Sequence, residues 1–392
     1  MNVILFDDPT IRIELLPFTF TRPIGALRVG ILTLAEKWEK YLETTVSFQT
    51  EPYLQKKYPA VSTTDNLLVN GALCPDDLLA ATVKSLPEGY FLVKGPLLLA
   101  ARNPVQEMNQ QNTIEYREPL TIIDKPWKIF RENGAQIRAD FKKITAGRTS
   151  AGIADRHTIV YGAEHIFVEE GVSIRAATLN AENGPIYLGK NSQIHEGALI
   201  RGAFALCENS QINMGAKVRG DVTVGPHSKV GGEISNSVII AYSNKAHDGF
   251  LGNSVVGEWC NIGADSNTSN LKNNYDLIKL WRHKEEGYVQ TELYFCGLMM
   301  GDHSKCSINT MFNTATVVDV SASVFGEGFP PNYVPSFSWG GAAGLTTYQL
   351  DKALETAARV VGRRDQVLSD VDKEILLHVY NATAHSRTWE KK

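Results

Sequence analysis

The sequence lacks the features that mark several large classes of protein. Its five cysteines are odd in number and form no CxxC pair, which argues against a disulfide framework and a zinc ribbon. No apolar run approaches the ~20 residues of a membrane-spanning helix. The net charge of −4 offers no basic excess for nucleic acid or anionic membrane. The start, MNVILFDDPT, lacks a signal peptide's basic residues. We expect a reduced, cytoplasmic protein with neither nucleic acid nor membrane as partner.

What the sequence does contain is a repeat. Eight aliphatic residues stand at an unbroken six-residue spacing from Leu188 to Val230. This spacing fits neither the 3.6-residue period of a helix nor one long strand, but it suits a solenoid of short strands and corners. The spacing returns at Phe250, Val256 and Ile262, and again from Met300 to Val324. The pattern predicts a left-handed parallel β-helix of hexapeptide repeats over residues 155–345.

Residues 1–145 have the pattern of an α/β domain with a mixed sheet. Short apolar runs at Asn2–Phe6, Asn66–Val69 and Tyr90–Val93 predict strands, and Leu32–Leu42 has the spacing of an amphipathic helix. Trp127–Lys143 is expected to be a helix leading out of this domain, although Gly134 weakens its continuity.

Two further segments flank or interrupt the repeat. The six-residue period stops after Gly263 and resumes after Gly297, and residues 265–296 are polar and rich in turn formers. Such an insertion is expected to project as a loop and to contribute to a binding surface. Residues 346–392 predict C-terminal helices, at Gln349–Val361 and Val367–Tyr380.

Polar side chains concentrate near His247 and the insertion. His247 and Asn261 lie fourteen residues apart, within one coil of about 18 residues if three hexapeptides make a turn. His247 is therefore expected near the root of the insertion, where a neutral imidazole could act as a general base. From position alone, a surface histidine that solvates a corner is the simpler interpretation.

A family resemblance favours the catalytic interpretation. Residues 246–276, AHDGFLGNSVVGEWCNIGADSNTSNLKNNYD, resemble the acetyltransferase domain of the bifunctional bacterial enzyme that acetylates glucosamine-1-phosphate and then uridylylates the product. The resemblance implies that His247 is the general base, that acetyl-CoA is the donor, and that the enzyme is a homotrimer. It also implies a set of substrate-binding residues (Asn261, Asn274, Tyr275, Asp276, Lys279) and two residues beside the cofactor (Ala264, Phe250).

This sequence departs from the family in several places. Phe250 stands where the family has Tyr, and Ser235 stands where it has a lysine that binds the substrate phosphate. Lys279 is one residue out of register, and the loop after Asp276 is much longer. The resemblance therefore implies an amino-sugar phosphate similar to glucosamine-1-phosphate, without fixing which acceptor sugar is used.

The N-terminal segment LLPFTFTRPIGALRVGILTLAEKWEKYL resembles the opening of sugar-nucleotide pyrophosphorylases, which implies a Rossmann-like nucleotidyltransferase fold. Several of the family's functional residues are missing here. Asp7-Asp8-Pro9-Thr10 stands where the family has its glycines, and Ala72 stands where it has the metal-binding Asp. Two carboxylates would repel phosphate unless Mg²⁺ lay between them. Arg12, Arg22 and Arg28 are the expected nucleotide-phosphate ligands.

The layout as a whole is similar to the alternative, Bacteroidetes-type form of the bifunctional enzyme. Three hypotheses follow. The first is an acetyl-CoA-dependent N-acetyltransferase acting on an amino-sugar phosphate, with a divergent nucleotidyltransferase domain that makes UDP-N-acetylglucosamine. The second is a sugar nucleotidyltransferase whose solenoid is a trimerisation stalk. The third is a non-catalytic scaffold that binds a sugar nucleotide.

Overall fold

The computed structural model describes residues 1–104 and 107–391, and these form two compact units. Unit 1 consists of residues 1–15, 21–27 and 32–125. Unit 2 consists of residues 16–20, 28–31 and 126–392. The two short N-terminal pieces of unit 2 therefore interrupt the sequence of unit 1.

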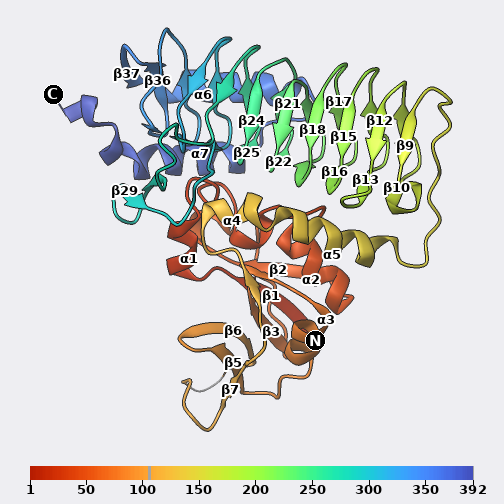
Figure 1. Cartoon of the computed structure of the whole chain (residues 1–392). Coiled ribbons are helices and arrows are strands. Elements are labelled where there is room, and N and C mark those ends of the chain that lie inside the picture. The colour runs from red at the N-terminus through yellow and green to blue at the C-terminus, as the bar shows by residue number, and fades with distance from the viewer. Residues whose placement is uncertain (105–106, 392) are drawn as a thin grey trace. The chain divides into compact units, whose positions relative to one another are not determined.

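Unit 1 is built on a mixed six-stranded sheet (Figure 1). The strand order is β2 (Val46–Gln49), β1 (Asn2–Phe6), β3 (Asn66–Asn70), β6 (Leu97–Arg102), β5 (Phe91–Lys94) and β7 (Thr113–Glu115), with β4 (Leu73–Cys74) and β8 (Thr121–Ile122) as a separate pair. Its helices are α1 (Pro9–Glu14), α2 (Leu34–Leu42) and α3 (Asp77–Lys84). The three expected strands and the expected helix are present. Helix α2 begins with a capping box between Thr33 and Glu36 and buries Trp38 in the core.

Unit 2 contains the expected left-handed parallel β-helix, whose coils present three faces. The first face is β10 (Ile166–Val168), β13 (Ile186–Leu188), β16 (Phe204–Leu206), β19 (Val222–Val224), β22 (Val238–Ala241), β25 (Val255–Glu258), β30 (Met299–Met300), β33 (Val317–Val318) and β35 (Tyr333–Val334). The second face is β11 (Ser173–Ile174), β14 (Gln193–Ile194), β17 (Gln211–Ile212), β20 (Lys229–Val230), β23 (Asn244–Lys245), β26 (Asn261–Ile262), β31 (Lys305–Cys306), β34 (Ser323–Val324), β36 (Ser338–Gly341) and β37 (Gly344–Thr347). The third face is β9 (Ile159–Tyr161), β12 (Thr178–Asn180), β15 (Leu199–Arg201), β18 (Lys217–Arg219), β21 (Glu233–Ser235) and β24 (Phe250–Gly252), continued by the pair β27 (Asn267–Thr268) and β32 (Met311–Phe312). From β10 to β32 the chain runs through the three faces in this order, coil after coil.

The repeat predicts most of the interior correctly. All eight aliphatic residues from Leu188 to Val230 point into the solenoid, each 2% exposed or less. The five residues expected from Met300 to Val324 are also buried in the same core. Phe250 is a wrong prediction, because Leu251 occupies the interior position and Phe250 is only half-buried. The corner between Leu251 and Val256 is one residue shorter than the six-residue rule assumes.

The insertion after β27 is more ordered than a polar loop. It forms an antiparallel hairpin of β28 (Lys279–Arg282) and β29 (Gly287–Gln290). The Trp281 ring stacks on Tyr333 of the first face, with ring centroids 4.0 Å apart. Nε2 of His283 lies 3.0 Å from the buried carboxylate of Asp319. The insertion leaves the solenoid at the corner between the third face and the first.

The segment expected as one helix, Trp127–Lys143, is two helices in unit 2, α4 (Pro126–Arg131) and α5 (Asn133–Thr145). Helix α5 runs along the solenoid (Figure 1). A Cβ atom at Gly134 would lie 2.2 Å from Oδ1 of Asp221, so the glycine permits this close approach. Both helices pack against the solenoid.

A buried polar network fastens residues 28–31 to α5 and the solenoid. The Gly30 amide donates to Oδ1 of Asn133 at 2.7 Å, and the Ile31 amide donates to Asp140 at 2.8 Å. The Thr223 hydroxyl donates to the Gly30 carbonyl at 2.9 Å. Because buried polar groups need partners, this set of bonds defines one docked conformation. Part of the segment that resembles the pyrophosphorylases therefore has a structural role here.

The corner between the first and second faces holds a column of residues with positive φ. Each adopts the left-handed conformation that L-residues rarely use, with φ between 51° and 61°, and these are Asn191, Asn209, His227, Tyr242, Trp259, His303, Ser321 and Phe337. Four of the side chains stack in sequence. The centroid distances are 4.7 Å for His227–Tyr242, 4.3 Å for Tyr242–Trp259 and 6.4 Å for Trp259–His303.

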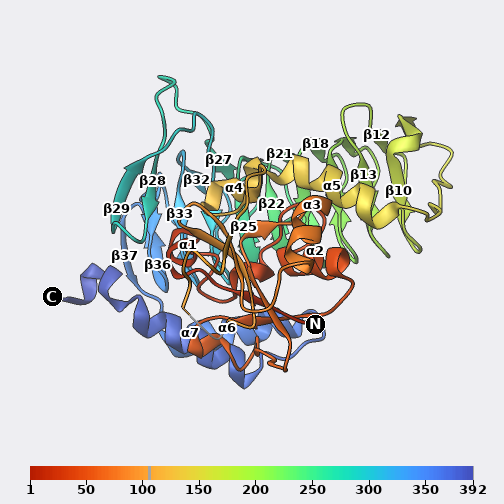
Figure 2. The ribbon, with the colours of Figure 1, turned by 90° about the horizontal axis from the view of Figure 1, so that it is seen from below.

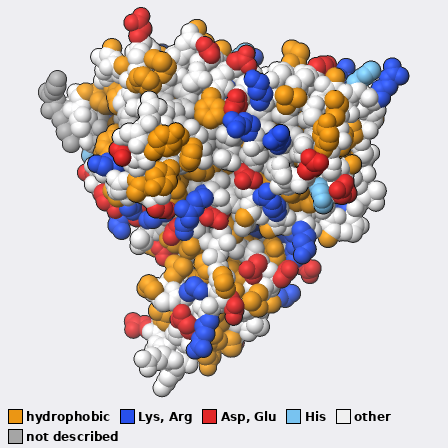
Figure 3. Space-filling view, viewed as in Figure 1, with side chains coloured by type: hydrophobic (Ala, Val, Ile, Leu, Met, Phe, Trp, Pro, Cys, Tyr) orange, Lys and Arg blue, Asp and Glu red, His pale blue; other side chains and the backbone are white. Residues whose placement is uncertain are grey.

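The two expected C-terminal helices are α6 (Leu350–Gly362) and α7 (Asp370–Ala382). Their apolar faces pack against the last coils in a cluster that includes Val320 and Phe337, with Trp259 packed against it. Figure 2 shows both helices lying along one side of unit 2. None of the described helices is long and apolar enough to cross a bilayer. On the face shown in Figure 3, basic and acidic side chains are interspersed over the solenoid.

Candidate functional site

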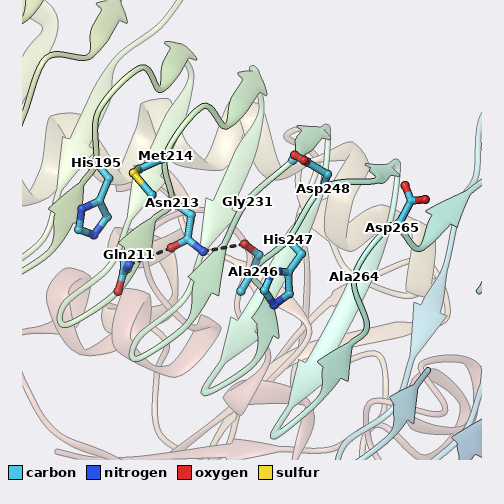
Figure 4. A pocket seen from close by; sticks show the side chains of 11 residues that line it. His195, Gln211, Asn213, Met214, Gly231, Ala246, His247, Asp248, Ala264 and Asp265 are labelled. Carbon is cyan, nitrogen blue, oxygen red and sulfur yellow. Dashed lines mark hydrogen bonds between the residues drawn. The ribbon is translucent and has the colours of Figure 1, made fainter. Parts of the chain in front are cut away.

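His247 lies on an exposed corner of the solenoid, between β23 on the second face and β24 on the third. Its side chain points away from the core (Figure 4). The carbonyl groups of this corner are all hydrogen-bonded. The Ala246 oxygen accepts from Nδ2 of Asn213 at 2.6 Å, and the His247 oxygen accepts from Nζ of Lys245 at 2.6 Å. The imidazole is therefore exposed to solvent, while the backbone that carries it is fixed by hydrogen bonds to its carbonyl groups.

A cavity of about 710 Å³ lies on the side of His247 that faces the earlier coils. We call it the acidic groove, and it is lined by His195, Gln211, Asn213, Met214, Gly231, Gly232, Ala246, His247, Asp248, Ala264 and Asp265. Gln211 donates to Oδ1 of Asn213 at 2.8 Å, which orients the Asn213 amide toward Ala246. These described lining residues include two carboxylates and neither lysine nor arginine. The groove therefore favours a positively charged group.

A second cavity, of about 670 Å³, lies on the other side of His247. We call it the basic groove, and it is lined by Lys229, Tyr242, Asn244, Ala246, His247, Trp259, Cys260, Asn261, Ile262, Gly263, Ala264, Lys305, Ile308, Val360, Arg363 and Arg364. These described residues carry four cationic side chains and no carboxylate. Aromatic rings and cations together suit a phosphorylated ligand that has a planar ring.

The cations of the basic groove are held by the fold. Nη2 of Arg364, just beyond α6, donates to Oδ1 of Asn244 at 3.0 Å. Burial, and secondarily the neighbouring Arg363, lowers the pKa of Arg364. Burial also lowers the pKa of Lys305 to about 8, and its Nζ donates to the His303 carbonyl at 2.8 Å. Both groups still carry charge at neutral pH.

Two of the expected binding residues lie beside His247. Strand β23 pairs with β26 in the register Asn244 to Asn261, so the corner after β26 stacks on the corner that carries His247. Asn261 and Ala264 accordingly line the basic groove together with His247. The contact is between consecutive coils and results from the parallel register.

The other expected residues are not part of either groove. Asn274, Tyr275 and Asp276 form a local turn, in which the Asp276 amide donates to Oδ1 of Asn274 at 3.2 Å, and Tyr275 is 69% exposed. Lys279 lies on β28, and Phe250 lies on the third face. The insertion starts at the corner between the third and first faces, whereas His247 lies at the corner between the second and third faces. The root of the insertion is therefore separated from His247 by the third face. The expectation that His247 lies beside that root is wrong.

In unit 1, the arginine and the carboxylates near the start of the chain bind one another or the local backbone. Arg12 donates to Oδ2 of Asp7 at 2.8 Å and to the Tyr53 hydroxyl at 3.0 Å. Burial raises the pKa of Asp7, although the Arg12 charge opposes this effect. Asp8 caps helix α1 by accepting from the amides of Thr10 and Ile11. The expected Mg²⁺ position between Asp7 and Asp8 thus competes with contacts that both carboxylates already make.

The remaining expected nucleotide ligands, Arg22 and Arg28, are both buried. Arg22 is 2% exposed in unit 1. Arg28 belongs to unit 2, where its Nη1 donates to the Ile31 carbonyl and lies 3.8 Å from Sγ of Cys207. Ala72 is fully buried and supplies no carboxylate. Among the described residues, no group of three or more His, Cys, Asp or Glu side chains could hold a metal ion.

Sequence reasoning missed the basic groove and the interior lysine. The signals were present as Arg363-Arg364 between two predicted helices and as a lysine, Lys245, six residues after Ile239. Neither could be recognised as part of the site, because Arg364 reaches Asn244 only through the packing of the C-terminal helices.

Residues 3–149 match the family model described as sugar nucleotidyl transferase. No functionally curated protein matches the chain at a significant level. Among solved structures, an Arabidopsis UDP-N-acetylglucosamine acyltransferase is 16% identical, over 61% of this chain and 95% of that chain, with a TM-score of 0.25. The UDP-N-acetylglucosamine O-acyltransferase of Moraxella catarrhalis RH4 is 14% identical, over 58% of this chain and 96% of that chain, with a TM-score of 0.23. Likenesses of this size carry no functional argument.

The fold and the family match define a class. The chain is a transferase whose residues 3–149 match the sugar nucleotidyl transferase family model and whose larger part is a left-handed parallel β-helix. We take as the candidate site the exposed corner that carries His247, which lies between the acidic and basic grooves.

Proposed function

We propose that the protein is an acetyl-CoA-dependent N-acetyltransferase that acts on an amino-sugar phosphate similar to glucosamine-1-phosphate. The observation that carries the proposal is the position of His247 on the boundary between the acidic and basic grooves. A base at such a boundary can reach a reacting centre that is shared by one ligand in each groove.

The chemistry that this arrangement supports is acyl transfer to an amine. The amine nitrogen attacks the thioester carbonyl carbon, a C–N bond forms, and the C–S bond breaks. His247 accepts the proton that the nitrogen loses, and the CoA thiolate leaves and is protonated. The products are an N-acetylated sugar and free CoA.

The charges of the grooves suggest an orientation for the two ligands. The phosphates of acetyl-CoA match the four cations of the basic groove, and its adenine matches the rings of Tyr242 and Trp259. The amino group of the acceptor matches Asp248 and Asp265 in the acidic groove. The acceptor phosphate then requires a cation outside this groove, for which Lys217, exposed on β18, is a candidate.

The direct test is acetyl transfer to glucosamine-1-phosphate and to glucosamine, followed by thiol release and by mass spectrometry of the product. We expect an N-acetylated product with both amines and a higher kcat/KM for the phosphorylated one. Absence of thiol release with either amine would refute the proposal.

We predict that Arg364→Gln raises the KM for acetyl-CoA about tenfold, with a smaller effect on kcat, because an arginine–phosphate pair contributes about 1.5–3 kcal/mol to binding. Steady-state kinetics with varied acetyl-CoA measure the effect. Arg359→Gln is the matched control, because Arg359 is exposed on α6, the helix that precedes Arg364, and pairs with Glu355. Equal KM values for the two variants would remove Arg364 from the donor site.

We also propose a homotrimer, in which Asn274, Tyr275 and Asp276 approach the His247 corner of a neighbouring subunit. The two corners that carry these residues flank the third face, so two copies packed side by side can bring them together. Multi-angle light scattering should give three times the monomer mass of 43.2 kDa. A monomeric protein would contradict this assembly.

A second candidate function, nucleotidyl transfer, is favoured by the family match of residues 3–149. The contacts of Asp7, Asp8 and Arg12 argue against it, because a nucleotide and Mg²⁺ would have to displace them. Pyrophosphate release from UTP and N-acetylglucosamine-1-phosphate, assayed with Mg²⁺, tests it. Release would support a bifunctional enzyme, and its absence would leave acetyl transfer or a non-catalytic binding role.

A further inference from the structure

One interior position of the solenoid is occupied by a lysine. Lys245 lies on the second face and is 3% exposed. The equivalent positions of neighbouring coils hold apolar side chains, namely Ile194, Ile212, Val230, Ile262, Cys306 and Val324. Burying an ammonium group costs several kcal/mol unless hydrogen bonds compensate, so an aliphatic residue would serve the core better.

The ammonium group of Lys245 is directed to the corner that carries His247. Its Nζ donates to the carbonyl of His247 at 2.6 Å and to the carbonyl of Asp248 at 3.1 Å. The Asp248 carbonyl also accepts from the amide of Asp265 at 3.0 Å. One buried side chain therefore holds two consecutive peptide groups from inside the solenoid.

We propose that Lys245 is a positioning residue for His247, and that its two hydrogen bonds fix the backbone from which the imidazole projects between the two grooves. The inference rests on the proposed function, because it assigns Lys245 a role in the reaction of His247. Displacement of a catalytic group by about 1 Å can lower a rate by two orders of magnitude.

The charge state of Lys245 fits this role. Burial lowers its pKa to about 8, while the carboxylates of Asp248 and Asp265 oppose the shift. The remaining titratable group that faces it is the Cys306 thiol, whose pKa burial raises. At neutral pH the lysine is therefore largely protonated and the thiol is neutral, so the ammonium donates to the two carbonyls without a competing anion in the core.

The test is Lys245→Met, which keeps the length of the side chain and removes the donor. We expect kcat for acetyl transfer to fall about tenfold or more, with little change in the KM for acetyl-CoA and no loss of thermal stability. In the His247→Ala background the same substitution should change the residual rate less than twofold, because Lys245 acts through His247. Ile194→Met, a volume-conserving change at the same face, is the control and should leave kcat unchanged.

A second readout does not depend on activity. Amide hydrogen exchange, measured by mass spectrometry, should show the amides of Glu233 and Asp265, which donate to the Gly249 and Asp248 carbonyls of this corner, exchanging at least about tenfold faster in Lys245→Met than in the wild type and in Ile194→Met. If the wild type lacks acetyl transfer, the proposed function fails, and the exchange of this corner alone then decides the role of Lys245. Unchanged exchange, or equal losses of kcat in the two backgrounds, would overturn the inference.

Discussion

His247→Ala is expected to lower kcat for acetyl transfer by about 10²–10⁴-fold, the usual contribution of a general base. The free energy of unfolding should change by less than about 0.5 kcal/mol, because the side chain is exposed. Discontinuous thiol-release assays over several hours can follow a loss of this size.

The interpretation of His247→Ala depends on a control histidine. His165 is exposed, with 58% of its side chain accessible, and it lines neither groove. His165→Ala should retain full activity. If His247→Ala keeps its kcat within a factor of ten of the wild type, another group accepts the proton and the base assignment is wrong.

Gly30→Ala is expected to lower the free energy of unfolding by about 3 kcal/mol, through two effects that add. Gly30 has a φ of +88°, which costs an L-residue about 1–2 kcal/mol. A Cβ atom there would also lie 2.4 Å from Oδ2 of Asp140 and 2.8 Å from the backbone of Gln136. Such overpacking typically costs about 1–3 kcal/mol and would disturb the hydrogen bonds of Gly30 to Asn133 and Thr223.

Urea denaturation followed by tryptophan fluorescence measures this loss. Gly147→Ala is the matched control, because Gly147 also has a positive φ (+71°) but no atom lies within 4 Å of a Cβ built there. It should report the backbone strain alone, about 1 kcal/mol. If Gly30→Ala is no less stable than Gly147→Ala, the packing of residues 28–31 against α5 and the solenoid does not contribute to stability.

The interior of the solenoid could be predicted because its signal is local and repeated. Each aliphatic residue from Leu188 to Val230 occupies the same place in its six-residue unit, so each can be predicted to be buried from its own repeat. All of them are buried. The prediction failed where the unit changes length, at Phe250, since a corner can lose a residue without any change in composition. It also missed Lys245, because its six-residue spacing from Ile239 can be recognised as an interior position only once the acceptor carbonyls are known.

The site could be predicted only in part, for a similar reason. The register of parallel strands explains why Asn261 and Ala264 lie beside His247. By contrast, the roles expected for Arg12 and Arg28 came from their places in a motif, whereas their contacts are with residues distant in sequence, such as Tyr53 and Cys207. The insertion was expected to be a loop because it is polar, but Trp281 supplies the ring that packs its hairpin on Tyr333.

At the corner between the first and second faces, the column of residues with positive φ keeps one backbone conformation while the side chains differ from coil to coil. Every coil imposes the same left-handed turn there, whether the residue is Asn191 in an early coil or Trp259 in a later one. A substitution at one of these turns can therefore change which segment packs against that corner, while the path of the backbone stays the same. In this protein the C-terminal helices pack in one cluster with two of the aromatic residues of the column, Trp259 and Phe337. We expect that placing the aromatic residues in other coils would shift the position at which these helices pack, and with it the positions of Arg363 and Arg364.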